Sequence, residues 1–143
     1  MKEMGRIIGI DYGEKRCGVA ASDPLHMIAG AHDVVVYKGG KQLLDALNRI
    51  CADLEAEKVV VGLPLNMDGS RGPSAQAAEA FAGKLGARIG LPIEMWDERL
   101  TTKTAEAALI EAGTRRDKRK LLVDKVAAQV MLQHYLDAHS SDP

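Results

Sequence analysis

The sequence has few cysteines and few aromatic residues, and each scarcity excludes a class of protein. Its two cysteines, Cys17 and Cys51, are too few for a disulfide framework or a cysteine-based zinc site, so we expect buried thiols in a reducing compartment. Aromatic residues make up 3% of the chain, which supplies few platforms for stacking the bases of a single strand. The four histidines show no metal-ligand spacing, and we assign them no role.

The sequence also lacks a long apolar run and an excess of either charge. No stretch approaches the roughly 20 apolar residues of a membrane span, and residues 1–6 lack the apolar core of a signal peptide. The 19 Lys and Arg residues nearly balance the 20 Asp and Glu residues, for a formal net charge of −1. This balance excludes a uniformly basic surface for nucleic acid. We therefore expect a cytoplasmic protein that binds any charged partner locally.

The length and apolar content are those of one domain. The chain has 143 residues, and 46% of them are hydrophobic, which is enough to bury a single core. We expect this domain to span residues 1–138 and to be followed by a frayed tail at 139–143.

Hydrophobic periodicity predicts a five-stranded sheet accompanied by helices. The predicted strands are 6–11, 16–22, 33–37, 58–62 and 92–97. The predicted helices are 43–54, 78–89, a segment capped by Thr101 or Thr102 that runs through Ala112, and 121–138. Three strands thus come first, and strands and helices alternate afterwards. This order predicts an α/β fold with a mixed sheet, in which an antiparallel meander precedes strand–helix crossovers.

Three carboxylates stand at the ends of predicted elements. Asp11 ends an apolar strand, where a buried charge is costly unless a cation or strong hydrogen bonds meet it. Glu98 directly follows the last strand, and Asp124 lies in the first turn of the last helix, in register with Ala128 on its apolar face. Carboxylates are preferred ligands of Mg²⁺ and Mn²⁺, so together they predict a metal site for phosphodiester chemistry. Taken singly, each has an equally simple structural explanation, such as a turn cap, a helix N-terminal residue or a partner of Arg99.

Four motifs occur along the chain in an order typical of one known family. They are Gly9-Ile-Asp11-Tyr-Gly13 with Lys15-Arg16-Cys17-Gly18-Val19-Ala20, Gly62-Leu-Pro64 with Met67-Asp-Gly-Ser70 and Gly72, Asp97-Glu98-Arg99-Leu-Thr-Thr102, and Asp124-Lys-Val-Ala-Ala-Gln129 with Leu132 and Tyr135. In these motifs the chain resembles the YqgF/RuvX family over nearly its whole length, with Cys17 in place of the more usual isoleucine. The resemblance implies an RNase H-like fold, with helices on both faces of a mixed five-stranded sheet.

The resemblance also implies an activity and its residues. It implies a metal-dependent nuclease that hydrolyses phosphodiester bonds in 5′-end processing of pre-16S rRNA. Asp11, Glu98 and Asp124 would be its catalytic carboxylates and would bind Mg²⁺ or Mn²⁺ in a two-metal-ion mechanism. Two alternatives stay open: a Holliday junction resolvase-type DNA endonuclease, and a non-catalytic nucleic-acid-binding protein of the same fold.

Basic residues near these carboxylates are candidates for contacts with phosphates. Five of the six residues from Arg115 to Lys120 are basic, and they stand in a predicted loop just before Asp124, although such a loop is often merely solvated. The candidates are Lys15, Arg16, Arg71, Arg99, Arg115, Arg116, Lys118, Arg119 and Lys120. The expected partners are structured RNA such as pre-16S rRNA, or branched DNA, with ribosomal precursor particles as a further partner. We expect recognition through shape and backbone rather than base sequence.

A competing resemblance starts from the same hairpin. Asp11, Gly13 and Gly18 are also similar to the phosphate-binding hairpin of actin-like ATPases and sugar kinases. Those enzymes close two such domains around a nucleotide, whereas 143 residues supply one. We therefore favour the nuclease.

Overall fold

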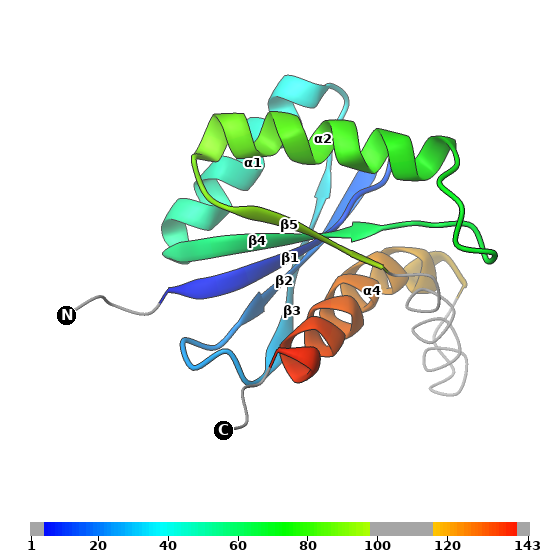
Figure 1. Ribbon diagram of the computed structural model, residues 1–143. Helices are drawn as coiled ribbons and strands as arrows, with labels where there is room; N and C mark the ends of the chain where they lie inside the picture. Colours follow the sequence, from blue (N-terminus) through cyan, green and yellow to red (C-terminus); the bar gives the residue numbers. More distant parts are fainter. Residues whose placement is uncertain (1–4, 98–115, 140–143) are drawn as a thin grey trace.

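The fold is built on a five-stranded mixed sheet. Figure 1 shows the computed structural model, which describes residues 5–97 and 116–139 and, within the second range, side chains from residue 126 onward. The strands are β1 (Arg6–Asp11), β2 (Arg16–Ser22), β3 (Ala29–Val36), β4 (Ala56–Leu63) and β5 (Ile93–Asp97). The helices are α1 (Gly40–Asp53), α2 (Pro73–Ile89) and α4 (Arg116–Ala138).

The strand order is β3-β2-β1-β4-β5, with β1 in the centre. β1 pairs antiparallel with β2, with Ile10 opposite Val19, because a short turn joins the two strands. β4 pairs in parallel with β5, because α2 connects the two strands. β1 also pairs in parallel with β4, which the chain reaches from β3 through α1. The predicted meander followed by crossovers is confirmed.

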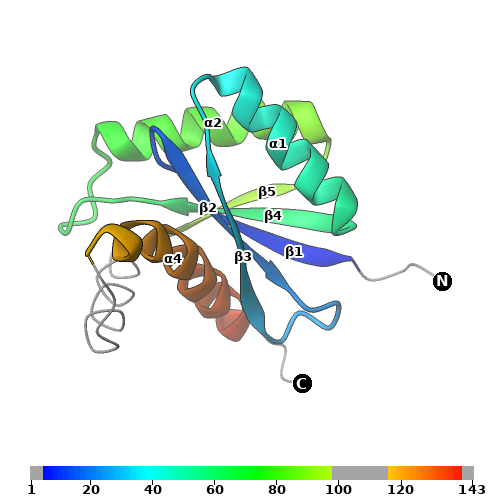
Figure 2. The ribbon, with the colours of Figure 1, turned by 180° about the vertical axis from the view of Figure 1, so that it is seen from behind.

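The helices cover both faces of this sheet. Figures 1 and 2 show α1 and α2 on one face and α4 on the other. Alternation along β1 divides its side chains between two cores: Ile8 and Ile10 pack on the side of α1 and α2, whereas Ile7 packs on the side of α4. The predicted helices on both faces are therefore confirmed.

Several elements begin earlier than their apolar patterns indicate. β3 starts at Ala29 rather than at residue 33, because Ala29, Gly30 and Ala31 pair with β2 although they have little strand propensity. α2 starts at Pro73, where proline at the first helical position lacks only an N–H group that would have no partner inside the helix. The first two strands have the predicted bounds.

The basic segment before Asp124 is helical. α4 begins at Arg116, so the prediction of a loop is wrong for residues 116–120. Lys and Arg favour helices, and neither Gly nor Pro interrupts residues 116–138, so the helix extends through this polar stretch without an apolar pattern. Arg115 and the helix predicted to run through Ala112 lie outside the described residues.

The end of α4 retains contacts beyond its last helical residue. The backbone N–H group of His139 donates to the carbonyl oxygens of Tyr135 and Leu136, at 3.1 and 3.2 Å. The ring of His139 stacks on that of Tyr135, with 4.0 Å between centroids. Residues 140–143 lie outside the described part of the chain. None of the helices described here is long and apolar enough to cross a membrane.

Candidate active site at the carboxyl edge of the sheet

Asp11 is the last residue of the central strand and is partly buried. Because side chains alternate along a strand, Asp11 shares a face with Ile7 and Gly9, and this face is covered by α4. Its backbone pairs with Gly18 of β2. The carboxylate therefore ends β1 on the face covered by α4, as a site built jointly with α4 requires.

α4 approaches β1 closely at Gly9. A Cβ atom at this position would lie 2.8 Å from Cβ of Leu132 and 3.4 Å from the carbonyl oxygen of Ala128. Asp124 precedes Ala128 by four residues, which is a rise of about 6 Å along a helix. Asp11 follows Gly9 by two residues, which is a rise of about 6–7 Å along a strand.

The direction of α4 brings both displacements to the same edge of the sheet. Tyr135, in the last turn of α4, contacts Lys58 and Glu94, which lie near the beginnings of β4 and β5. α4 therefore runs from the carboxyl edge of the parallel strands toward their amino ends. The backbone of Asp124 is thus brought to the edge at which Asp11 lies.

β5 ends at the same edge. Its last pair joins Leu63 of β4 to Asp97, and the even-numbered residues Glu94 and Trp96 contact Tyr135 of α4. Glu98 and Arg99 follow directly in the sequence and lie outside the described residues.

Among the side chains that the structure describes, at residues 5–97 and 126–139, no three from His, Cys, Asp or Glu form a group able to hold a metal ion. Of the three predicted ligands, Asp11 is the one whose side chain the structure describes. Asp124 is described by its position in α4, beside the strand end that carries Asp11. The carboxylate oxygens of the three predicted ligands are of the type that hard divalent cations such as Mg²⁺ prefer.

The predicted phosphate-binding residues fall into three groups. Lys15 is exposed in the β1–β2 turn and Arg16 begins β2, so both follow Asp11 at the same end of the sheet. Arg71 lies in the loop before α2 and is ion-paired with Glu79, which reduces its charge for an incoming phosphate. A third group, which consists of Arg116, Lys118, Arg119 and Lys120, lies in α4 upstream of Asp124. Arg99 and Arg115 lie outside the described residues.

An aromatic cluster beside Asp11 was missed by sequence reasoning. Tyr12 stacks on Phe81 of α2, with 4.3 Å between ring centroids and 13° between planes. The hydroxyl of Tyr37, just after β3, donates to the carbonyl oxygen of Gly13. Burial, and then the hydrogen bond with Tyr12, raises the pKa of the Tyr37 hydroxyl. Tyr12 directly follows Asp11, which was the available sequence signal, but nothing local identifies Phe81 as its neighbour.

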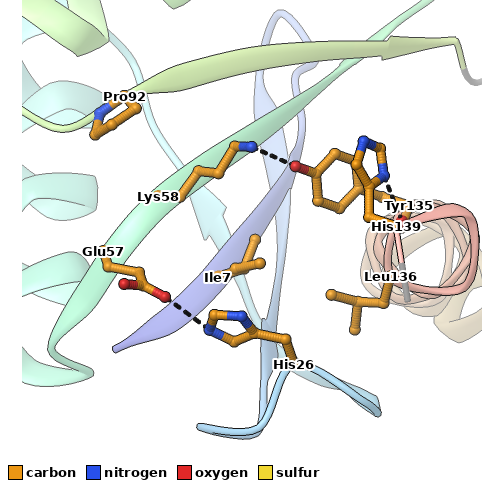
Figure 3. A pocket seen from close by; sticks show the side chains of 8 residues that line it. All are labelled: Ile7, His26, Glu57, Lys58, Pro92, Tyr135, Leu136 and His139. Carbon is orange, nitrogen blue, oxygen red and sulfur yellow. Dashed lines mark hydrogen bonds and ion pairs between the residues drawn. The ribbon is translucent and has the colours of Figure 1, made fainter. Parts of the chain in front are cut away.

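The opposite edge of the sheet has different chemistry. A pocket of about 410 Å³ lies there. Figure 3 shows residues that line it, with dashed lines joining Lys58 to Tyr135, His26 to Glu57 and His139 to Tyr135. Lys58 also lies 2.6 Å from Glu94, and the two atoms of the His26–Glu57 pair are 2.8 Å apart. Because the charged groups of this pocket pair with one another, they fasten α4 and the β2–β3 loop to the sheet.

Two solved structures share this arrangement of sheet and helices. Thermus thermophilus RuvC in complex with a Holliday junction substrate is 18% identical, with a TM-score of 0.54 and coverage of 94% of each chain. The fowlpox virus resolvase in complex with Holliday junction DNA is 11% identical, with a TM-score of 0.57 and coverage of 95% of this chain and 99% of the other. At these identities the likeness shows the fold, which is the RNase H-like fold of the resolvases, as predicted.

Sequence relatives identify the family within that class. The family model described as "RuvX: Holliday junction resolvase" matches residues 5–138. A protein of Syntrophomonas wolfei is 47% identical over 135 residues, covering 94% of this chain and 96% of its own length. One of Listeria monocytogenes is 49% identical over 134 residues, covering 92% and 97%. Both are named "Putative pre-16S rRNA nuclease". The chain belongs to the RuvX family, and the predicted resemblance is confirmed.

Proposed function

We propose that this protein is a divalent-metal-dependent nuclease that hydrolyses phosphodiester bonds in the 5′-end processing of pre-16S rRNA. The observation that carries the proposal is the closeness of α4 to β1 at Gly9, which sets the Asp124 position beside the strand end bearing Asp11. The substrate class comes from the names of the relatives.

The carboxylates Asp11, Glu98 and Asp124 would hold Mg²⁺ or Mn²⁺. Glu94 and Trp96 are the β5 residues that contact α4, and Glu98 is the next even-numbered position in the sequence. When bound, such ions activate water and neutralise charge on the leaving oxygen of an in-line displacement.

The chain itself would bind and orient the substrate strand. The first two turns of α4 contain four basic residues ahead of Asp124, so a strand following this helix end would pass the carboxylates. Lys15 and Arg16 offer further positive charge at the same end of the sheet. Arg71 would contribute less, because Glu79 already pairs with it.

Resolution of DNA junctions is the second candidate, and the two resolvase complexes of the same fold favour it. The assay that separates the candidates measures cleavage of a labelled pre-16S rRNA leader, an unstructured RNA and a four-way DNA junction, each with Mg²⁺ or Mn²⁺. The wild type is compared with Asp11→Asn and with Asp53→Asn, which removes an exposed carboxylate at the end of α1.

We expect metal-dependent cleavage of the leader RNA by the wild type and by Asp53→Asn, and none by Asp11→Asn. Preferential cleavage of the junction would support the second candidate. If RNA is bound but no substrate is cut under any of these conditions, the nuclease proposal is wrong and the chain is a binding protein of the same fold.

A further inference from the structure

We propose that the cleft formed by Tyr12, Phe81 and the beginning of α1 receives an unpaired nucleobase of the strand whose phosphate lies at Asp11. The inference deepens the proposed function and rests on it for the position of the phosphate. It changes the expected mode of recognition, because backbone and shape would then be supplemented by contact with a base.

The cleft has the size of a ligand site and lies near the strand end that bears Asp11. Its volume is about 430 Å³, within the range of about 300–1,000 Å³ that is typical of small-molecule pockets. It lies between α1 and α2, at the β1–β2 turn, and Figure 2 shows these three segments close to one another. This is the end of the sheet at which β1 finishes with Asp11.

Aromatic rings form part of its wall. Tyr12 and Phe81 are stacked, and Tyr37 is held by its hydrogen bond to Gly13, so these three rings are positioned before any ligand binds. They are three of the five aromatic residues of the chain. Bases stack on such rings with little dependence on their identity, because every base has a π-face.

The charges at the cleft favour an anionic ligand. Lys38 and Lys84 are exposed and line the cleft, together with one carboxylate, Glu14. Neither lysine forms an ion pair with another described residue, so both charges remain available to a nucleotide phosphate.

Consecutive residues connect the two sites. Asp11 lies on the α4 side of β1, whereas Tyr12 packs with the core on the side of α1 and α2. A strand with a phosphate at Asp11 therefore reaches Tyr12 by passing over the carboxyl end of β1. A base within a duplex is stacked and paired, so the base that enters the cleft must come from a loop, a strand end or a distorted junction.

The first test measures binding in EDTA, so that it is independent of cleavage. A fluorescent single-stranded RNA of nine nucleotides is compared with variants that lack one base at each position in turn. We expect one position at which base removal weakens binding by at least fivefold for the wild type and for Tyr12→Phe. In Tyr12→Leu, which keeps an apolar side chain but loses the ring, removal of that base should change the affinity less than twofold.

A charge-matched pair tests the lysines. Lys84→Glu should weaken binding of the intact RNA severalfold more than Arg49→Glu, which makes the same kind of charge reversal on an exposed α1 residue that does not line the cleft. Equal effects of the two reversals would show that the cleft has no special role.

A second measurement needs no substitution, so it decides the question even if Tyr12→Leu fails to fold. Aromatic NMR signals of the wild type are followed during titration with the same nine-nucleotide RNA and its abasic variants in EDTA. The signals of Tyr12, Tyr37 and Phe81 should move saturably, and less with the abasic variant that binds weakly. The proposal is wrong if these rings do not respond, or respond equally to all abasic variants. If the base effect is present but no substrate is cut, the proposed function fails and this inference stands.

Discussion

Gly9 of β1 and Leu132 of α4 are so close that a Cβ atom on Gly9 would lie 2.8 Å from Cβ of Leu132. Real Cβ atoms essentially never approach that closely, so the absence of a side chain at Gly9 sets how near α4 comes to the central strand. The same contact influences the distance between the Asp11 and Asp124 positions. Asp11 lies two residues after Gly9 in β1, and Asp124 lies four residues before Ala128 in α4. A packing residue is therefore also a determinant of the candidate site.

Gly9→Ala should destabilise the protein by about 1–3 kcal/mol, because the added methyl group overpacks the contact with Leu132. Gly83→Ala is the matched control: a Cβ at Gly83 meets nothing within 4 Å, and alanine in a helix is favoured over glycine by about 0.5–1 kcal/mol. Urea denaturation of the two variants should thus give changes of opposite sign. Any nuclease activity should fall in Gly9→Ala more than in Gly83→Ala, since small displacements of catalytic groups are costly. Equal stability of the two variants would contradict this account.

The sequence predicts what depends on local pattern. The first two strands have the predicted bounds because turn residues and apolar runs delimit them. Asp11 is a candidate site residue on the same local evidence, because a charge at the end of an apolar strand requires a partner. The start of α4 was missed because its first turns lack an apolar face and form through the helix propensity of Lys and Arg.

Other features of the site depend on contacts between distant residues. Tyr12, which directly follows β1, stacks on Phe81 of α2, 69 positions further along the sequence. No local hydrophobic periodicity predicts this contact. The pairing of Arg71 with Glu79 follows from how the loop turns back over the first turns of α2. Both contacts change the surface expected to bind substrate. The first adds the rings of Tyr12 and Phe81, and the second pairs the charge of Arg71 with Glu79.

Acid should weaken the attachment of α4 to the sheet through Glu94. The hydrogen bond from Lys58 lowers the pKa of Glu94 below its ordinary value of 4.5, although burial acts in the opposite direction. Burial also opposes the charge of Lys58, but hydrogen bonds with Glu94 and Tyr135 outweigh it and raise the Lys58 pKa. Because the folded-state pKa of Glu94 is lowered, its stabilisation is present above pH 4.5 and is lost as the pH falls through the folded-state value.

Glu94→Gln should therefore reduce stability at pH 7 and flatten the loss of stability as the pH falls below 4.5. The effect should be at most about 1 kcal/mol, because the Glu94 side chain is 37% exposed and solvent screens the pair. Asp53→Asn, at the exposed end of α1, is the control. Chemical denaturation at several pH values gives the comparison, and parallel pH profiles for Glu94→Gln and the wild type would show that this network does not contribute.

The two thiols should be unreactive in the folded protein. Cys17 and Cys51 are 0% and 4% exposed, and burial raises the pKa of Cys51 to about 11. Lack of access slows the attack of both thiols on a disulfide reagent, and the low thiolate population slows it further at Cys51. Modification at pH 8 should therefore be at least roughly 100-fold slower than in the unfolded chain. The single variants Cys17→Ser and Cys51→Ser assign the two rates. Rapid labelling of either thiol in the native protein would mean that this side of the core opens readily.

Divalent metal should stabilise the protein through Asp11. In the proposed site the carboxylates would repel one another without a cation, and a ligand that binds the folded state alone adds about 1.4 kcal/mol at ten times its Kd. A millimolar Mg²⁺ titration should therefore raise the Tm of the wild type by a few degrees. Asp11→Asn should lose this response, because it removes one of the proposed metal ligands. Asp53→Asn should respond like the wild type, since its substitution is remote from β1. A wild type whose Tm stays constant, or an Asp11→Asn protein that responds normally, would place metal binding elsewhere than at the end of β1.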